Sequence, residues 1–225
     1  MENTDALENR LTFGTLTADG FPCLPRALIG DLPWIDIQGS NDKFPATQLK
    51  WAASGGKLFG RTRIGPVDWA TICQSGLNNG HDVVVDNMRF FCRLPDISDG
   101  RPAWPGQWMD DFWATGKDSK RGMIRRMRGV APPGPDLIWM PESVETAKHV
   151  LVLVLEPILP DLSALTGKKV SVLTLLGKGT GVLREASDYD FVLADYDGIL
   201  NPSWSRTTGT ETLLRQDAVI NIGRC

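Results

Sequence analysis

Short apolar runs of alternating character recur through the C-terminal third of the chain. The segments "HVLVLVLEP", "KKVSVLTLLG", "YDFVLADYDG" and "DAVINIG" are separated from one another by Gly, Pro and Asn turns. This spacing is typical of short antiparallel strands rather than of helices. Residues 141–225 are therefore predicted to form an antiparallel β-meander or sandwich.

The N-terminal half has a different pattern. In residues 1–65, Gly and Pro recur at short intervals and interrupt both helical and strand periodicity, which predicts a loop-rich region with short extended pieces such as 34–37. The stretch "PVDWATICQSGL" from Pro66 predicts one short helix, because Trp69, Ile72 and Cys73 share a face. Gly76 would end that helix.

Residues 81–130 contain further mixed signals. The stretch "HDVVVDNMRFFCRL" is rich in β-branched and aromatic residues and predicts a strand near 83–94. Farther along, residues at helical spacing predict two short helices within 105–129, broken at Gly116 or Gly122. A Pro-rich connector at 130–141 then separates a region 1–130 from a region 141–225, although both fit within one continuous domain. The predicted fold class is α+β and mainly β.

The composition and net charge of the chain exclude several classes of function. The formal net charge is −3, so there is no overall field that would draw the chain to nucleic acid or to an anionic membrane. The four cysteines form no C-x-x-C pair and there are only two histidines, which argues against a zinc site and for reduced thiols. There is no G-x-S-x-G or H-E-x-x-H signature, and no leader segment is expected. We therefore expect no cofactor, no membrane partner and synthesis in the cytoplasm.

Residues 175–190, "LLGKGTGVLREASDYD", resemble the nucleotidyltransferase pattern. In that pattern a strand ends in Gly-Ser and two acidic residues one apart bind a divalent metal, which here would be Asp188 and Asp190. Lys178 takes the place of the serine. The alternative is a glycine-rich turn between two strands, followed by a solvent-facing acidic turn, and this interpretation is favoured.

A second resemblance covers about residues 51–101. The stretch "FFCRLPDISDGR", Phe90 to Arg101, resembles the F-x-L-P-D-L-R-G-R element of phage tail-fibre collar domains. The preceding "WAASGGKLFGRTRIGPVDWATICQSGLNNG" is similar to the part of that domain with a Trp, a small-residue turn, a short helix and a Gly/Asn loop. The resemblance implies a structural part of a virion, with no catalytic residues to transfer.

A basic segment at 117–128 contains Lys117, Lys120, Arg121, Arg125, Arg126 and Arg128. If the segment is helical, Arg121, Arg125 and Arg128 form one strip that contacts an acidic neighbour. The aromatic cluster Trp104, Trp108, Phe112 and Trp113 precedes it and is the other candidate interface. Alternatively, the segment binds nucleic-acid phosphate, with Trp108 and Trp113 as stacking surfaces.

These observations favour a non-enzymatic structural or assembly protein, most plausibly a bacteriophage virion component of the tail or head–tail region. Its partners would be other copies of itself and other structural proteins. We further expect a homo-oligomer in which adjacent subunits order residues 1–65, because loops alone would not bury the aromatic residues there: Phe13, Phe21, Trp34, Phe44, Trp51 and Phe59. Two alternatives stay open: a nucleotidyltransferase-like enzyme that uses Asp188 and Asp190, and a nucleic-acid-binding accessory protein that uses 117–128.

Overall fold

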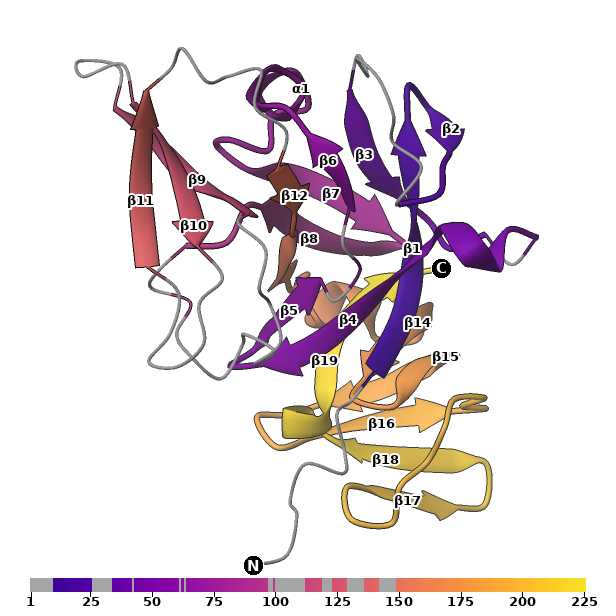
Figure 1. The fold of residues 1–225 in the computed structure, drawn as a ribbon. Coiled ribbons are helices and arrows are strands. Elements are labelled where there is room, and N and C mark those ends of the chain that lie inside the picture. The colour runs from indigo at the N-terminus through magenta and orange to yellow at the C-terminus, as the bar shows by residue number, and fades with distance from the viewer. Residues whose placement is uncertain are drawn as a thin grey trace, which may run out of the picture.

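The computed structural model describes residues 10–25, 34–41, 43–60, 62, 64–96, 99, 112–118, 123–128, 136–141 and 149–225. In 112–118, 123–128 and 136–141 it describes the backbone path. The described chain is mainly β and is arranged in three sheets, in which almost every neighbouring pair of strands is antiparallel (Figure 1). No helix in these residues is long and apolar enough to cross a membrane.

The largest sheet has eight strands and curls into a half-barrel. Its main path runs β2-β1-β4-β5-β13-β8-β7, and β3 pairs with β1 outside that path. The strands in chain order are β1 (Arg10–Ala18), β2 (Phe21–Pro22), β3 (Ile35–Gln38), β4 (Gln48–Ser54), β5 (Lys57–Gly60), β7 (His81–Val85), β8 (Met88–Arg93) and β13 (Val154–Ile158). A short 3-10 turn, Pro45–Thr47, precedes β4.

The prediction that residues 1–65 are loop-rich is wrong, because this region supplies five strands of the curled sheet. Its periodicity was hidden by a β-bulge in β1. The register with β4 shifts between Thr12 and Thr15, and Gly14 there has a φ of 72°. A bulge inserts an extra residue and changes which positions face inward, so simple alternation fails across it. The short extended piece at 34–37 is confirmed as β3.

The single strand predicted near 83–94 is a hairpin instead. β7 and β8 pair antiparallel around Asp86 and Asn87, whose φ angles of 51° and 67° are those of a type I′ turn. The turn matches the twist of the two strands and so allows a two-residue connection. Within β8 and the residue after it, alternate side chains enter the core: Met88, Phe90, Cys92 and Leu94.

The helix predicted after Pro66 is present as α1 (Trp69–Gln74). Asp68 caps it, since its carboxylate accepts a 2.8 Å hydrogen bond from the Thr71 backbone N–H. Pro66 itself belongs to β6 (Ile64–Val67) rather than to the first turn of the helix. Gly76, with a φ of 72°, follows the last turn as expected.

The two helices predicted within 105–129 are also wrong where the structure describes the chain. β9 (Phe112–Asp118) and β10 (Met123–Arg128) are antiparallel strands, and β11 (Asp136–Pro141) pairs with β10. The sequence "MIRRMR" places its apolar residues 123, 124 and 127 at helical spacing, but the segment is short, and pairing with two neighbouring strands overrides that period. These strands join β12 (His149–Leu151) and β6 in a five-stranded sheet, in which β9 and β12 run parallel.

The antiparallel sheet predicted for the C-terminal part is confirmed for residues 169–224, whereas the first predicted segment, 149–157, forms β12 and part of β13 and joins the other two sheets. The C-terminal sheet contains six strands in the order β17-β18-β16-β15-β14-β19. They are β14 (Lys169–Thr174), β15 (Gly177–Ala186), β16 (Asp190–Ala194), β17 (Ser205–Thr208), β18 (Glu211–Arg215) and β19 (Val219–Arg224). Short 3-10 turns at Ser163–Leu165 and Gln216–Ala218 precede β14 and β19. Its core includes Val172, Leu183, Phe191, Leu193 and Leu214.

The C-terminal sheet packs against the curled sheet through β19, which lies beside β8 (Figure 1). The Asn221 side-chain amide donates a 2.7 Å hydrogen bond to the carbonyl of Arg89. A Cβ atom at Gly223 would lie 1.9 Å from the carbonyl oxygen of Asn87, so only glycine permits this approach. The two sheets also share apolar packing, because Leu173 and Ile220 contact the core of the curled sheet.

Gly223→Ala tests this packing. We expect it to lower the free energy of unfolding by about 1–3 kcal/mol, because the added methyl group would force backbone apart between two sheets. Urea denaturation measures the change. Gly39→Ala is the matched control, since a Cβ there would meet its nearest atom at 3.4 Å, an ordinary contact. Equal effects of the two substitutions would contradict the proposed close approach.

Candidate functional site

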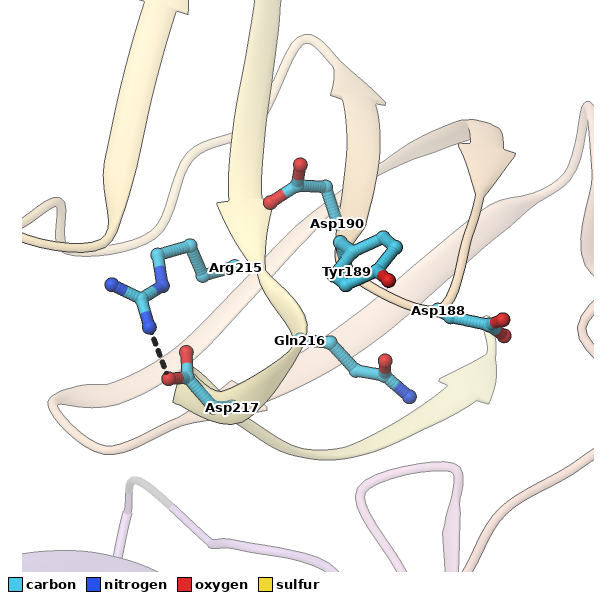
Figure 2. Close-up of a pocket in the computed structure, with 6 residues that line it drawn as sticks. All are labelled: Asp188, Tyr189, Asp190, Arg215, Gln216 and Asp217. Carbon is cyan, nitrogen blue, oxygen red and sulfur yellow. Dashed lines mark hydrogen bonds and ion pairs between the residues drawn. The ribbon is translucent and has the colours of Figure 1, made fainter.

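A hollow lined by ionisable side chains is at one end of the C-terminal sheet. It has a volume of about 520 Å³, opens to solvent, and is formed by the β15–β16 turn and the end of β18. Six residues line it: Asp188, Tyr189, Asp190, Arg215, Gln216 and Asp217 (Figure 2). Three of these six carry a carboxylate, so the lining is acidic.

Ser187 organises this turn. Its hydroxyl accepts hydrogen bonds from the backbone N–H groups of Tyr189 and Asp190, at 3.2 and 3.0 Å. Its own backbone N–H donates to the Asp190 carbonyl at 2.9 Å. Such a serine-closed turn leaves the intervening side chains outside, and Tyr189 is 80% exposed. The prediction that Asp188 and Asp190 lie in or beside a turn is confirmed.

The carboxylates do not converge on one point. Figure 2 shows those of Asp188 and Asp190 pointing in different directions, with the Tyr189 ring between them. The third carboxylate, Asp217, forms a 2.5 Å ion pair with Arg215. Among the described residues, no group of three or more His, Cys, Asp or Glu side chains could hold a metal ion.

The glycine and lysine of the nucleotidyltransferase-like pattern lie far from this turn. β15 is ten residues long and begins at Gly177, while the two aspartates follow its other end. At about 3.3 Å per residue, the two parts are separated by roughly 30 Å along the strand. Lys178 instead forms a 3.1 Å ion pair with Asp86 of the β7–β8 turn. The structure therefore does not bring these elements together in one site.

A second polar cluster lies on the outer face of the curled sheet. Arg93 on β8 contacts Glu156 on β13 and Asp99, each at 2.5 Å. Lys57 on β5 contacts the same two carboxylates at 3.1 and 2.9 Å. The side chain of Asp99 is fully buried, and it also accepts a 2.7 Å hydrogen bond from the Asp96 backbone N–H. The cluster therefore ties the segment after β8 to three strands.

Ion pairs and hydrogen bonds within this cluster determine the protonation states of its side chains. Burial by itself would raise the pKa of Asp99, but hydrogen bonds from Arg93, the Asp96 N–H and Lys57 outweigh it and lower the pKa to about 2. Glu156 follows the same balance and its pKa is also lowered. The pKa of Lys57 is raised, first by its hydrogen bond to Asp99. Arg93, Lys57, Asp99 and Glu156 are thus all held in their charged forms. Such a cluster suits a structural role, in which it holds strands together, and does not suit proton transfer at neutral pH.

The residues predicted as interface candidates have different outcomes. Trp104, Trp108 and Arg121 lie outside the described residues. Trp113 lies on β9, and Arg125 and Arg128 lie on β10. The expected helical strip is wrong for the latter two, because positions three apart on a strand belong to opposite faces.

Five of the six aromatic residues named for the first 65 positions divide into two groups, and the sixth, Trp34, is half-buried. Phe13, Trp51 and Phe59 are buried within the chain, and the Trp51 indole N–H donates a 2.9 Å hydrogen bond to the Phe13 carbonyl. Phe21 and Phe44 are 74% and 54% exposed. The argument that loops cannot bury this aromatic area is therefore corrected, because strands of the region pack these side chains into a core shared with later strands: the ring centroids of Phe13 and Phe90 on β8 are 5.9 Å apart, and Phe59 packs against Val154 on β13.

In the stretch that resembles the collar domain, Trp51 lies on β4 and is followed by the Gly55-Gly56 turn, α1 and the β7–β8 hairpin. The sequence departs from the family pattern at two places: Cys92, which is buried, replaces the phenylalanine two residues before Leu94, and Ser98-Asp99-Gly100-Arg101 replaces the downstream Arg-Gly. No protein-family model, curated protein or solved structure matches the chain. The resemblance thus rests on this stretch alone.

The sequence pattern did not identify Asp86 and Asp99 as residues that hold strands and loops together. For Asp86 a signal was present, because Asp-Asn between two β-branched or aromatic runs is typical of a hairpin turn. For Asp99 there was none, since its partner Lys57 lies 42 positions away.

The substitution Asp99→Asn tests whether the ion pairs of Asp99 stabilise the fold. Because the folded pKa of Asp99 is below the unfolded value of about 3.9, its charge stabilises the fold above about pH 4, and this stabilisation is lost as the pH falls towards 2. We expect the variant to lose about 2 kcal/mol at neutral pH and to show a weaker dependence of stability on pH below 4. Urea denaturation at several pH values measures this, with the exposed Glu185→Gln as control. An unchanged acid profile would refute the assignment.

Proposed function

We propose that this chain is a non-enzymatic structural or assembly protein, and that it is a component of a bacteriophage virion, in the tail or head–tail region. After synthesis in the cytoplasm it docks on other copies of itself and on other structural proteins. The supporting observation is the use that the fold makes of its charged side chains. In the described part of the chain, the buried or half-buried carboxylates Asp86, Asp99 and Glu156 are engaged in fastening strands and loops.

Exposed apolar side chains support a docking role. Phe21 lies on β2, a short strand of the curled sheet that pairs with β1, and Tyr189 lies in the acidic hollow. Others are exposed by 36% or more: Leu24, Phe44, Val84, Leu159, Ile199, Leu200 and Leu213. Burying one such side chain against a neighbour contributes about 1.5–3 kcal/mol, so a few of them are enough to support an interface. The collar-like order of elements in residues 51–101 supports the virion setting.

The basic segment 117–128 supports a second possibility, nucleic-acid binding. It carries six basic residues and one acidic residue, Asp118, and most of it lies on the paired strands β9 and β10. The same charge would serve equally to contact an acidic protein surface. The near-balanced charge of the whole chain favours the protein partner.

Sedimentation velocity on the purified chain tests the proposal. We expect a stable oligomer or polymer at micromolar concentration. Replacing the three arginines of β10, Arg125, Arg126 and Arg128, with Glu is expected to weaken that assembly in a salt-dependent way and to leave the circular dichroism of the monomer unchanged.

Two results would contradict the proposal. One is a monomer that binds nucleoside triphosphate with Mg²⁺ in calorimetry and loses this binding in Asp190→Ala, which would favour the enzyme. The other is a monomer that binds duplex or single-stranded nucleic acid through the basic segment.

A further inference from the structure

The two end strands of the half-barrel, β3 and β7, lie side by side without a shared ladder. In the described chain, β3 pairs with β1 and β7 pairs with β8, and no strand pairing joins β3 to β7. Side chains make the connection instead. Ser40, two residues after β3, contacts Asp86 at the end of β7, and the Ile35 backbone N–H donates a 2.7 Å hydrogen bond to Ser75 after α1. Because side chains rather than a backbone ladder join β3 to β7, a change in the charge of one side chain can strengthen or weaken this junction.

His81, the first residue of β7, occupies this junction. Its Nε2 atom lies 3.6 Å from Oδ1 of Asp36 on β3. Its Nδ1 atom is buried and has no hydrogen-bond partner. The ring lies against the end of α1, because a Cβ atom at Gly76 would be 3.4 Å from Nδ1. The imidazole of His81 thus faces β3 with its Nε2 atom and the end of α1 with its Nδ1 atom.

A proton changes what this ring can do. A neutral imidazole has one N–H for its two nitrogens, whereas the protonated ring donates from both and carries a positive charge. At Nε2 that charge faces the Asp36 carboxylate, which already accepts a 2.7 Å hydrogen bond from the Ile37 N–H. At Nδ1 the new donor faces the backbone of Gly76, next to the C-terminal end of α1, where the helix dipole favours a cation. Protonation therefore improves both contacts at once.

We propose that His81 is a proton-operated latch that closes the half-barrel between β3 and β7, tight when the imidazole is protonated and loosened when it is neutral. The inference does not depend on the proposed assembly function.

The charges around His81 agree with this assignment. The pKa of His81 is raised, and its principal cause is the hydrogen bond to Asp36. Desolvation by burial lowers this pKa in part, whereas Gly76 and Asp82 raise it further. Asp82, next to His81 on β7, is paired with Arg89 at 2.7 Å. Cys92, the cross-strand neighbour on β8, has a thiol whose pKa is raised by burial and so stays neutral. Asp36 is thus the one ionised group that approaches His81 from another strand among the described residues.

The sign of the effect follows from the raised pKa. The folded protein binds the proton more tightly than the unfolded chain, so the latch stabilises the fold fully below the unfolded histidine value of about 6.5. This stabilisation is lost as the pH rises through the folded value.

Two measurements test the latch. A histidine NMR titration of the whole chain gives the pKa of His81, which His81→Gln distinguishes from His149, the other histidine. Amide hydrogen exchange of β3, corrected for the intrinsic effect of pH, follows the junction itself. We expect a His81 pKa above the unfolded value of about 6.5, and protection of β3 that falls in the wild type as the pH rises through that folded pKa. In His81→Gln that fall should disappear, while in His149→Gln it should persist.

Either of two outcomes would overturn the proposal: a His81 pKa at or below the unfolded value, or the same pH-dependent loss of β3 protection in His81→Gln. If His81→Gln does not fold, Asp36→Asn decides the question with His81 intact. The latch requires the His81 pKa to fall in that variant, and an unchanged pKa would contradict it.

Discussion

The carboxylate of Asp86 lies where three parts of the chain meet, in the turn between β7 and β8, with only 9% of its side chain exposed. It accepts hydrogen bonds from the Ser40 backbone N–H at 2.7 Å and from the Ser40 hydroxyl at 2.5 Å. The same hydroxyl accepts a 2.9 Å hydrogen bond from the Gly14 N–H on β1, and Lys178 on β15 brings its charge to the carboxylate from the C-terminal sheet. Two sheets are thus joined through one charged group whose removal would leave several polar partners unsatisfied.

This arrangement explains how the fold uses its charges. The β7–β8 turn is fixed by Asp86, the segment after β8 is fixed by Asp99, and β19 can approach the same turn because Gly223 has no side chain. Groups that would suit acid–base chemistry in a cleft are here committed to holding strands in place. The acidic hollow at Asp188 and Asp190 differs, because it is open and lined by an exposed tyrosine, which suits contact with another surface. These two observations are the ones on which the proposed structural or assembly role rests.

The parts of the fold that could be predicted from sequence are those with local signals. The C-terminal strands alternate cleanly and are bounded by turn residues, and α1 has its Asp68 cap and its terminal Gly76. The failures have physical causes. The bulge at Gly14 hid the alternation of β1, and the short basic run of β10 has its apolar residues at helical spacing although it pairs as a strand. The Asp86 and Asp99 contacts depend on residues distant in sequence, which local patterns do not reveal.

The urea-induced unfolding of Asp86→Asn tests the central role of this carboxylate most directly. Asparagine tolerates the left-handed backbone of the turn, so the substitution removes the charge and one acceptor while it keeps the hairpin. Asp82→Asn on the same hairpin is the control, because Asp82 is 53% exposed and its pair with Arg89 is worth at most about 1 kcal/mol. We predict that Asp86→Asn lowers the free energy of unfolding by about 2 kcal/mol or more and exposes the Ser40 amide to hydrogen exchange. A loss no larger than that of Asp82→Asn, with the Ser40 amide still protected, would contradict the account.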